Sequence, residues 1–395
     1  MVSMPALIRP AHLLPLFLLV ACSAGDGEQQ WEPQLIGEPI ALGDAGDADG
    51  RNPTLEAIDG ERYLVAWDAY RGGGGRDVFA RTLSIDGELG SEHRLGREGP
   101  SGEFNVGLAR NPDRNETLVG WVYQYDGVDS EGFNSLRGSI LSTDGTQSEV
   151  LKLSGDQASH RNTNMTLSYD AGSKEYVVFT TQTPGGKAKA VLRRFTADGQ
   201  PTQSTQVDIN STALGLSTDG PPGESLVLWR DYVLGKLYVR AFGPAGALGN
   251  RLTLHEGWSA AKIGGYDAVR EQYLVTHTED GVLIGRFVGR DGQAAGDTFP
   301  IVDYGEGLPG IGGYDLAYHS EIQSFVLVWG QSTGTLHMRT IAGDGTLGPE
   351  VSVFPFLVQS GPQLAVTGKH FAIVWQDSGG IFAQRGKFVE SGPSN

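Results

Sequence analysis

The sequence predicts an all-β protein, because it is rich in glycine, lacks helical periodicity and repeats one strand motif along its length. Glycine accounts for 58 of the 395 residues, about twice the usual share. Neither a coiled-coil heptad nor a long amphipathic helix can be found in it. A composition of this kind is typical of many short strands that are joined by tight turns.

The repeated motif is an apolar run that ends in tryptophan, as in Tyr63-Leu64-Val65-Ala66-Trp67. Complete copies end at Trp67, Trp121, Trp229, Trp329 and Trp375. Two degenerate copies end instead at Thr180 and His277. The seven copies lie roughly 46–59 residues apart, a spacing that indicates an array of equivalent structural units.

Each copy continues into a second strand and a tight turn. The turns are Asp86-Gly87, Asp144-Gly145, Asp198-Gly199, Ala245-Gly246, Asp291-Gly292 and Asp344-Gly345. Asp-Gly favours a hairpin, because glycine tolerates positive φ. With one strand upstream and one after the turn, each repeat contains four strands. Four short antiparallel strands at this period predict a blade, so the chain is predicted to be a β-propeller of seven blades rather than six or eight.

The two ends of the array complement each other. The seventh copy stops near Phe388 with only three strands, and the segment Ile36–Leu42 resembles the fourth-strand pattern at Leu347–Val351. We therefore expect the N-terminal strand to close the last blade, which leaves no unpaired edge. The propeller is placed at residues 34–390, followed by a short tail at 391–395. The pattern resembles a broad class of secreted bacterial propellers, and this resemblance implies a fold without an activity.

Residues 1–21 have the features of an export signal. Arg9 is their only Lys or Arg, they contain no acid, and the apolar run from Leu13 to Val20 is too short to span a membrane. The run ends in Leu19-Val20-Ala21-Cys22, which resembles the lipobox of bacterial lipoproteins, and Cys22 is the only cysteine in the chain. The resemblance implies cleavage before Cys22 and lipid attachment to its thiol. An ordinary secretory signal with a chance cysteine is the alternative.

Residues 22–33 are accordingly expected to form a lipidated N-terminus and a flexible tether. Ser23 follows the cysteine where an aspartate would favour the inner membrane, so the analogy implies the outer membrane of a bacterial cell envelope. The side on which the protein faces, periplasm or cell surface, stays open. The net charge is −17, and it becomes −18 without the signal, which contains Arg9. So acidic a surface excludes nucleic acid as a partner.

Residues that recur in most copies are expected to be structural. A set of arginines lies five residues before each turn or its equivalent: Arg81, Arg193, Arg240, Arg286, Arg339 and Arg385. They are predicted to pair with carboxylates or backbone carbonyls of their blades rather than to line a channel. The repeated tryptophans are predicted to pack between blades.

Function is expected where the copies differ. A long insertion at 124–133 follows the second copy, and Tyr123, Tyr125 and Phe133 around it suit contact with a glycan or a protein. His277 replaces tryptophan in the fifth copy and lies close in sequence to Glu279, a pattern compatible with a general base and its orienting carboxylate. Neither a nucleophile nor a metal-ligand set can be recognised beside it in the sequence.

In one acidic stretch, the carboxylates are spaced as in a calcium-binding loop. Asp47, Asp49 and Glu56 match positions three, five and twelve of an EF-hand-like loop, but Ala45 occupies the first position. A plain acidic connector is the favoured interpretation, with Ca²⁺ as the alternative and no other cofactor expected. Gly330-Gln331-Ser332-Thr333-Gly334 matches a nucleophile elbow, but the flanking residues predict strands on both sides instead of a strand and a helix.

The sequence thus favours a non-catalytic, membrane-tethered propeller lipoprotein that binds a protein or a glycan through its blade loops. One alternative is a cell-envelope hydrolase or lyase that acts on carbohydrate in the central channel. Another is a structural component of an envelope assembly. The ligand or partner itself cannot be read from the residues.

Overall fold

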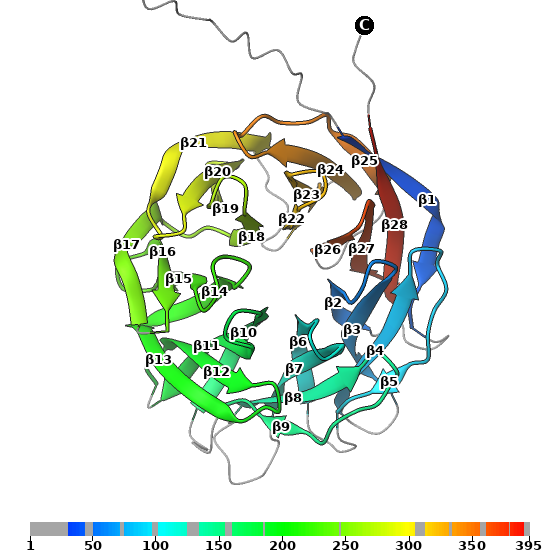
Figure 1. The fold of residues 1–395 in the computed structure, drawn as a ribbon, viewed down its shortest axis with the longest axis horizontal. Coiled ribbons are helices and arrows are strands. Elements are labelled where there is room, and N and C mark those ends of the chain that lie inside the picture. The colour runs from blue at the N-terminus through cyan, green and yellow to red at the C-terminus, as the bar shows by residue number, and fades with distance from the viewer. Residues whose placement is uncertain are drawn as a thin grey trace, which may run out of the picture.

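A computed structural model describes residues 31–43, 50–71, 75–96, 102–124, 134–154, 160–184, 186–244, 246–304, 313–331, 334–355, 361–378 and 380–390. These residues form seven four-stranded antiparallel sheets arranged in a ring around a central axis (Figure 1). The predicted seven-bladed β-propeller is therefore confirmed. Within the part of the chain described here, we find no helix that is long and apolar enough to cross a membrane.

Each blade consists of an inner strand, two middle strands and an outer strand. Blade 1 contains β2 (Arg51–Ala57), β3 (Arg62–Tyr70), β4 (Arg76–Ser84) and β5 (His93–Arg94); blade 2 contains β6 (Gly102–Asn111), β7 (Glu116–Gln124), β8 (Asn134–Ser142) and β9 (Leu151–Lys152). Blade 3 contains β10 (His160–Asp170), β11 (Glu175–Pro184), β12 (Lys189–Thr196) and β13 (Pro201–Ile209); blade 4 contains β14 (Ser211–Ser217), β15 (Ser225–Asp231), β16 (Lys236–Gly243) and β17 (Gly246–Glu256).

The remaining blades follow the same order. Blade 5 contains β18 (Ala261–Asp267), β19 (Gln272–Glu279), β20 (Val282–Gly289) and β21 (Ala294–Asp303); blade 6 contains β22 (Tyr314–His319), β23 (Ser324–Gly330), β24 (Thr335–Ala342) and β25 (Val351–Pro355). Blade 7 contains β26 (Gln363–Thr367), β27 (His370–Asp377), β28 (Gly380–Glu390) and, as its outer strand, β1 (Trp31–Ala41).

The N-terminal strand closes the ring as predicted. β1 pairs antiparallel with β28, from Trp31 opposite Glu390 to Ala41 opposite Phe382. It begins at Trp31, three residues before the start that the sequence predicts for the propeller. Because β1 comes from the opposite end of the chain, its hydrogen bonds hold the first and last blades together without a covalent link.

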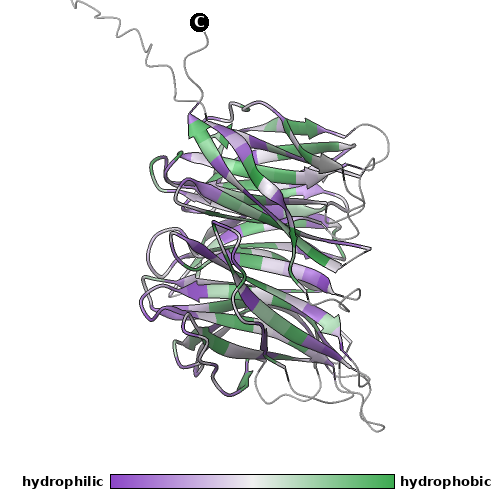
Figure 2. Ribbon diagram, turned by 90° about the vertical axis from the view of Figure 1, so that its right-hand side faces the viewer, coloured by the Kyte–Doolittle hydropathy of each residue, from purple (hydrophilic) through white to green (hydrophobic). Residues whose placement is uncertain are grey.

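The hydrophobic core is divided among the seven interfaces between adjacent blades. Trp67, for example, lies in a cluster that contains residues of blades 7 and 1, and Trp229 lies in a cluster shared by blades 3 and 4. The five repeated tryptophans are all at most 2% exposed. Hydrophobic residues accordingly run through the strands, with hydrophilic ones at many of the turns (Figure 2). The interpretation of these tryptophans as packing residues is confirmed.

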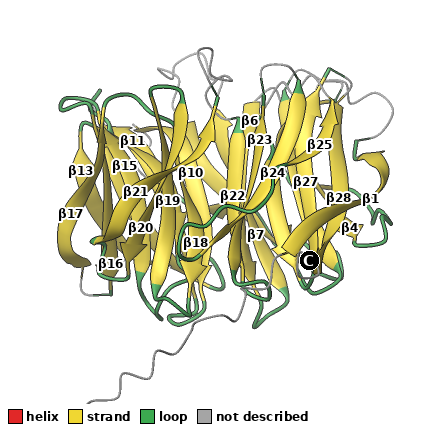
Figure 3. Cartoon of the chain, turned by 90° about the horizontal axis from the view of Figure 1, so that it is seen from above, coloured by secondary structure: helices red, strands yellow, loops and turns green. Residues whose placement is uncertain are grey.

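The antiparallel order gives the ring two different faces. We call upper the face with the connections from the second to the third strand of each blade and from each outer strand to the next blade. The lower face carries the other connections. Figure 3 shows the ring edge-on, with the strands running between these faces. Since β1 pairs with β28 through Trp31 and Glu390, both ends of the propeller lie at the lower face.

Candidate functional site

The repeated arginines lie on the third strands of their blades and mainly bind backbone carbonyls. Arg81 donates to Gly90 O and Leu42 O, and Arg240 donates to Gly249 O. In blade 2, where serine replaces the arginine, Ser139 Oγ donates to Ser148 O. Arg385 donates to Ile85 O across the junction of blades 7 and 1. These residues fasten strands together, in agreement with the structural interpretation of the repeat.

The upper mouth of the channel is polar. A cavity of about 360 Å³ opens there and is lined by residues of the inner strands, including Asn52, Asn105 and Asn164. Asn52 and Asn105 have positive φ values of 50° and 54° at the β-bulges of β2 and β6. Asparagine tolerates this conformation better than most residues. The three amides thus occupy corresponding places in blades 1 to 3 and face one mouth.

Glu56 is a buried carboxyl group of blade 1 whose pKa is affected by the charge of Asp219 in blade 4. Glu56 lies near the lower end of β2 in blade 1, and Asp219 follows β14 in blade 4. Burial raises the pKa of Glu56 to about 8, with the charge of Asp219 adding to the rise and Arg110 opposing it. Burial also raises the pKa of Asp219. The channel therefore holds a carboxyl group that is largely protonated at neutral pH.

A patch of exposed apolar side chains covers the upper end of blade 4. This blade-4 patch comprises Ile209, Tyr232, Val233, Leu234 and Trp258. Trp258 and Val233 are each 71% exposed, and the rings of Tyr232 and Trp258 lie 5.8 Å apart between centroids. A backbone hydrogen bond of 2.8 Å from Tyr232 N to Asn210 O joins the β15–β16 turn to the end of β13. Exposed apolar patches of this kind commonly mark binding surfaces.

Charged groups border the patch and position its tryptophan. The guanidinium of Arg230 lies 4.8 Å from the centre of the Trp258 ring and donates a hydrogen bond to Ser259 O. Lys236 and Glu256 form an ion pair beside the β15–β16 turn. The indole is thus held on one side by a cation while its surface stays exposed to solvent.

Next to the patch, between blades 4 and 5, two histidines and a glutamate come together. His277 of β19 occupies the position of the repeated tryptophan and is 2% exposed. Its ring stacks against that of His255 in β17, with 5.1 Å between the centroids. Glu279 Oε2 lies 3.6 Å from His277 Nε2 and 3.8 Å from His255 Nδ1. Burial and the neighbouring His255 lower the pKa of His277, so its imidazole is neutral at pH 7.

The insertion of blade 2 is described only in part. Tyr123 lies near the upper end of β7, half-buried against the core, with the Arg137 guanidinium 5.4 Å from its ring centre. Tyr125 and Phe133 lie outside the described residues, as do Cys22, Asp47 and Asp49. Of the residues with calcium-like spacing, only Glu56 is described, and it lies in β2, the inner strand of blade 1. β23 ends at Gly330 and β24 begins at Thr335. The sequence that matches a nucleophile elbow therefore lies between two strands, as predicted, and not between a strand and a helix.

Sequence reasoning missed the blade-4 patch and the partner of His277. Trp258 is one of seven tryptophans, and only five of these occupy the repeat position. A tryptophan outside the repeat was therefore a visible signal. His255 carries no such signal, because it belongs to the preceding repeat and meets His277 only through the packing of blade 4 on blade 5.

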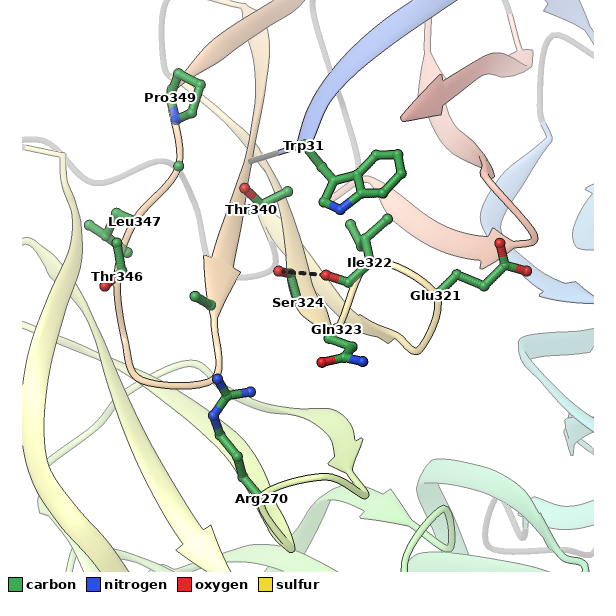
Figure 4. A pocket seen from close by; sticks show the side chains of 12 residues that line it. Trp31, Arg270, Glu321, Ile322, Gln323, Ser324, Thr340, Thr346, Leu347 and Pro349 are labelled. Atoms are coloured by element: carbon green, nitrogen blue, oxygen red, sulfur yellow. Dashed lines mark hydrogen bonds between the residues drawn. The ribbon is translucent and has the colours of Figure 1, made fainter. Parts of the chain in front are cut away.

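A second cavity lies on the lower face, where the described chain begins. It measures about 240 Å³, and Trp31, Arg270, Glu321 and Leu347 are among the residues that line it (Figure 4). The ammonium group of Lys369 lies 5.0 Å from the centre of the Trp31 ring. Trp31 also packs against the core between blades 6 and 7. These contacts fix the start of β1 on the face opposite the blade-4 patch.

Comparisons with known proteins support the propeller fold only. No family model matches the chain, and neither does any curated protein sequence. Among solved structures, the BP39L lectin from Burkholderia pseudomallei is 14% identical, with 87% of this chain and 96% of the lectin covered at a TM-score of 0.61. The WD40 domain of Toxoplasma gondii coronin is 10% identical, with 93% and 88% covered at a TM-score of 0.53. At these identities the likeness is one of fold, so the chain is similar in architecture to known propeller proteins.

Proposed function

We propose that this protein is a membrane-tethered, non-catalytic propeller lipoprotein that binds a partner through the upper ends of its blades. The observation that supports the proposal most is the blade-4 patch. It groups two aromatic and three aliphatic side chains in an acidic protein, and soluble monomers rarely leave such groups exposed together.

A protein is the ligand class that the patch fits better. Interfaces between proteins are enriched in tryptophan, tyrosine and arginine, surrounded by a polar rim. Trp258, Tyr232 and Arg230 provide these residue types, and Lys236 with Glu256 provides part of the rim. A glycan would use the two rings but would gain little from Val233 and Leu234.

The proposed anchor is compatible with this surface. A lipid on Cys22 would connect through residues 23–30 to Trp31, which lies at the lower face. The blade-4 patch lies at the upper face, so it would point away from the membrane. An outer-membrane location, expected from Ser23, would place the patch in the periplasm or outside the cell.

Site-specific photo-crosslinking in intact cells tests the binding surface. A photoreactive phenylalanine analogue at Val233 is expected to yield a discrete crosslinked protein, and Trp258→Ala is expected to abolish it. Val269, which is 65% exposed on the lower face, is the matched control position. Equal crosslinking at both positions, or none at Val233, would contradict a protein partner. Glycan-array binding that depends on Trp258 would then favour the glycan.

The anchor has its own test. Cys22→Ser is expected to release a folded propeller from the membrane fraction, and mass spectrometry of the wild type is expected to show the lipid. A variant that stays bound, together with an unmodified wild-type Cys22, would contradict the lipoprotein proposal without affecting the patch.

One observation favours carbohydrate hydrolysis in the channel as a second candidate function. Glu56, with its pKa near 8, is a carboxyl group that can donate a proton at neutral pH. Glycosidases usually pair such an acid with an ionised carboxylate, however, and burial raises the pKa of Asp219 as well. Release of reducing ends from envelope glycans that is lost in Glu56→Gln would support the enzyme. Unchanged activity in that variant would exclude Glu56 as its acid.

A further inference from the structure

His255, His277 and Glu279 form a set of metal ligands that bridges two blades. Each residue offers one ligand atom, and the three atoms all lie within 4.8 Å of one another. The two distances that involve Glu279 Oε2 are 3.6 and 3.8 Å. Ligand atoms around a tetrahedral zinc ion lie about 3.4 Å apart, since each bond is about 2.0–2.1 Å long. The three side chains are therefore close to the spacing that an ion would impose.

The chemistry of the set selects the class of metal. Two imidazoles and one carboxylate suit Zn²⁺ and similar late first-row divalent ions, whereas Ca²⁺ prefers oxygen ligands alone. Glu279 is half exposed, which gives the ion a path from solvent.

The surroundings explain why the two histidines meet here. At the equivalent junction of blades 3 and 4, Trp229 reaches the penultimate residue of the outer strand, Asp208. His277 occupies the tryptophan position one blade further on, and His255 is the penultimate residue of β17. Gly257 leaves room for the His255 ring, because a Cβ there would lie 3.0 Å from His255 Nε2. Between blades 4 and 5, His255 and His277 thus take the places that Asp208 and Trp229 have between blades 3 and 4.

We propose that His255, His277 and Glu279 bind one Zn²⁺ or similar divalent ion, which links blade 4 to blade 5. Three protein ligands leave the fourth position of a tetrahedral ion for water or an added ligand. The ion fastens β17 to β19 at a junction where histidine replaces the repeated tryptophan. This site is independent of the partner proposed for the blade-4 patch.

Metal titration of the full-length protein, purified in detergent without a histidine tag, tests the site. Calorimetry is expected to show one Zn²⁺ per chain, no comparable binding of Ca²⁺, and a higher melting temperature with Zn²⁺. His277→Gln and His255→Gln are each expected to weaken Zn²⁺ binding by at least about tenfold. His337→Gln is the matched control, because His337 pairs with Glu350 but belongs to no ligand cluster among the described residues.

A double variant distinguishes loss of Zn²⁺ binding from loss of folding. His255→Asp with His277→Trp reproduces the residue pair that joins blades 3 and 4, and it is expected to fold without binding Zn²⁺. Co²⁺ should give visible absorption bands of a tetrahedral complex in the wild type and none in the double variant. The proposal is wrong if the wild type binds no Zn²⁺ at near-unit stoichiometry, or if the glutamine variants bind it as tightly as the wild type.

Discussion

The indole of Trp229 donates a hydrogen bond of 2.9 Å from Nε1 to Asp208 Oδ2, and this bond joins blade 4 to blade 3. The equivalent tryptophans of blades 1 and 2 have no such bond to a described residue. Nε1 of Trp67 and of Trp121 is buried without a partner among the described residues. The repeat therefore fixes the position of the ring, whereas of these three indoles only that of Trp229 has a hydrogen-bond partner among the described residues.

This difference predicts unequal costs for the same substitution. Trp229→Phe should lower the free energy of unfolding by about 1–2 kcal/mol more than Trp67→Phe, because only Trp229 loses a hydrogen bond to a charged group. Urea denaturation followed by circular dichroism measures both variants. Equal losses would show that the bond to Asp208 contributes nothing beyond packing.

Glu56 predicts a stability that falls as the pH rises. Between the ordinary value of 4.5 and its folded pKa of about 8, the unfolded chain ionises this carboxyl group while the folded chain keeps the proton. The folded state then binds more protons, so the free energy of unfolding decreases with pH in this window, on the order of 3 kcal/mol in total. Glu56→Gln should remove this dependence. Unfolding curves at pH 5 and pH 8 test it, with Glu61→Gln as an exposed control.

The repeat made the fold predictable, including the exchange of the N-terminal strand. Trp67 and its counterparts recur in register with the turns, and the missing fourth strand of blade 7 matched the pattern of β1. The pairing of His255 with His277 was harder to predict from the sequence, for a physical reason. His255 and His277 lie in different repeats and meet only when neighbouring blades pack. Trp258 differs, since its place outside the repeat was visible in the sequence.

Closure of the ring by β1 predicts that this strand can act in trans. A chain that lacks residues 31–41 exposes the edge of β28 and loses the packing of Trp31 and Leu35. Its melting temperature should fall by about 10 °C or more. A synthetic peptide of residues 31–41 should restore part of the loss by adding a strand to β28, whereas a scrambled peptide should not. Full stability of the truncated chain would mean that β1 is dispensable for closure.

The ion pair between Arg194 and Asp170 predicts the largest single loss of stability. Arg194 Nη1 lies 2.8 Å from Asp170 Oδ2, and both side chains are at least 95% buried. Burial alone would raise the pKa of Asp170, but hydrogen bonds from Arg194 and from the backbone of Gly223 lower it below 3.8 overall. Its contribution to stability is therefore present above that value and is lost as the pH falls through the folded pKa.

Arg194→Met leaves a buried carboxylate without its cation, so the free energy of unfolding at pH 7 should drop by about 3–5 kcal/mol. Adding Asp170→Asn should recover part of this loss, because it removes the unpaired charge. Arg114→Met, which breaks an exposed pair with Asp198, is the control and should cost less than about 1 kcal/mol. A double variant no more stable than Arg194→Met would show that the guanidinium acts through its bonds to Gly223 O and Ser225, and not through the charge of Asp170.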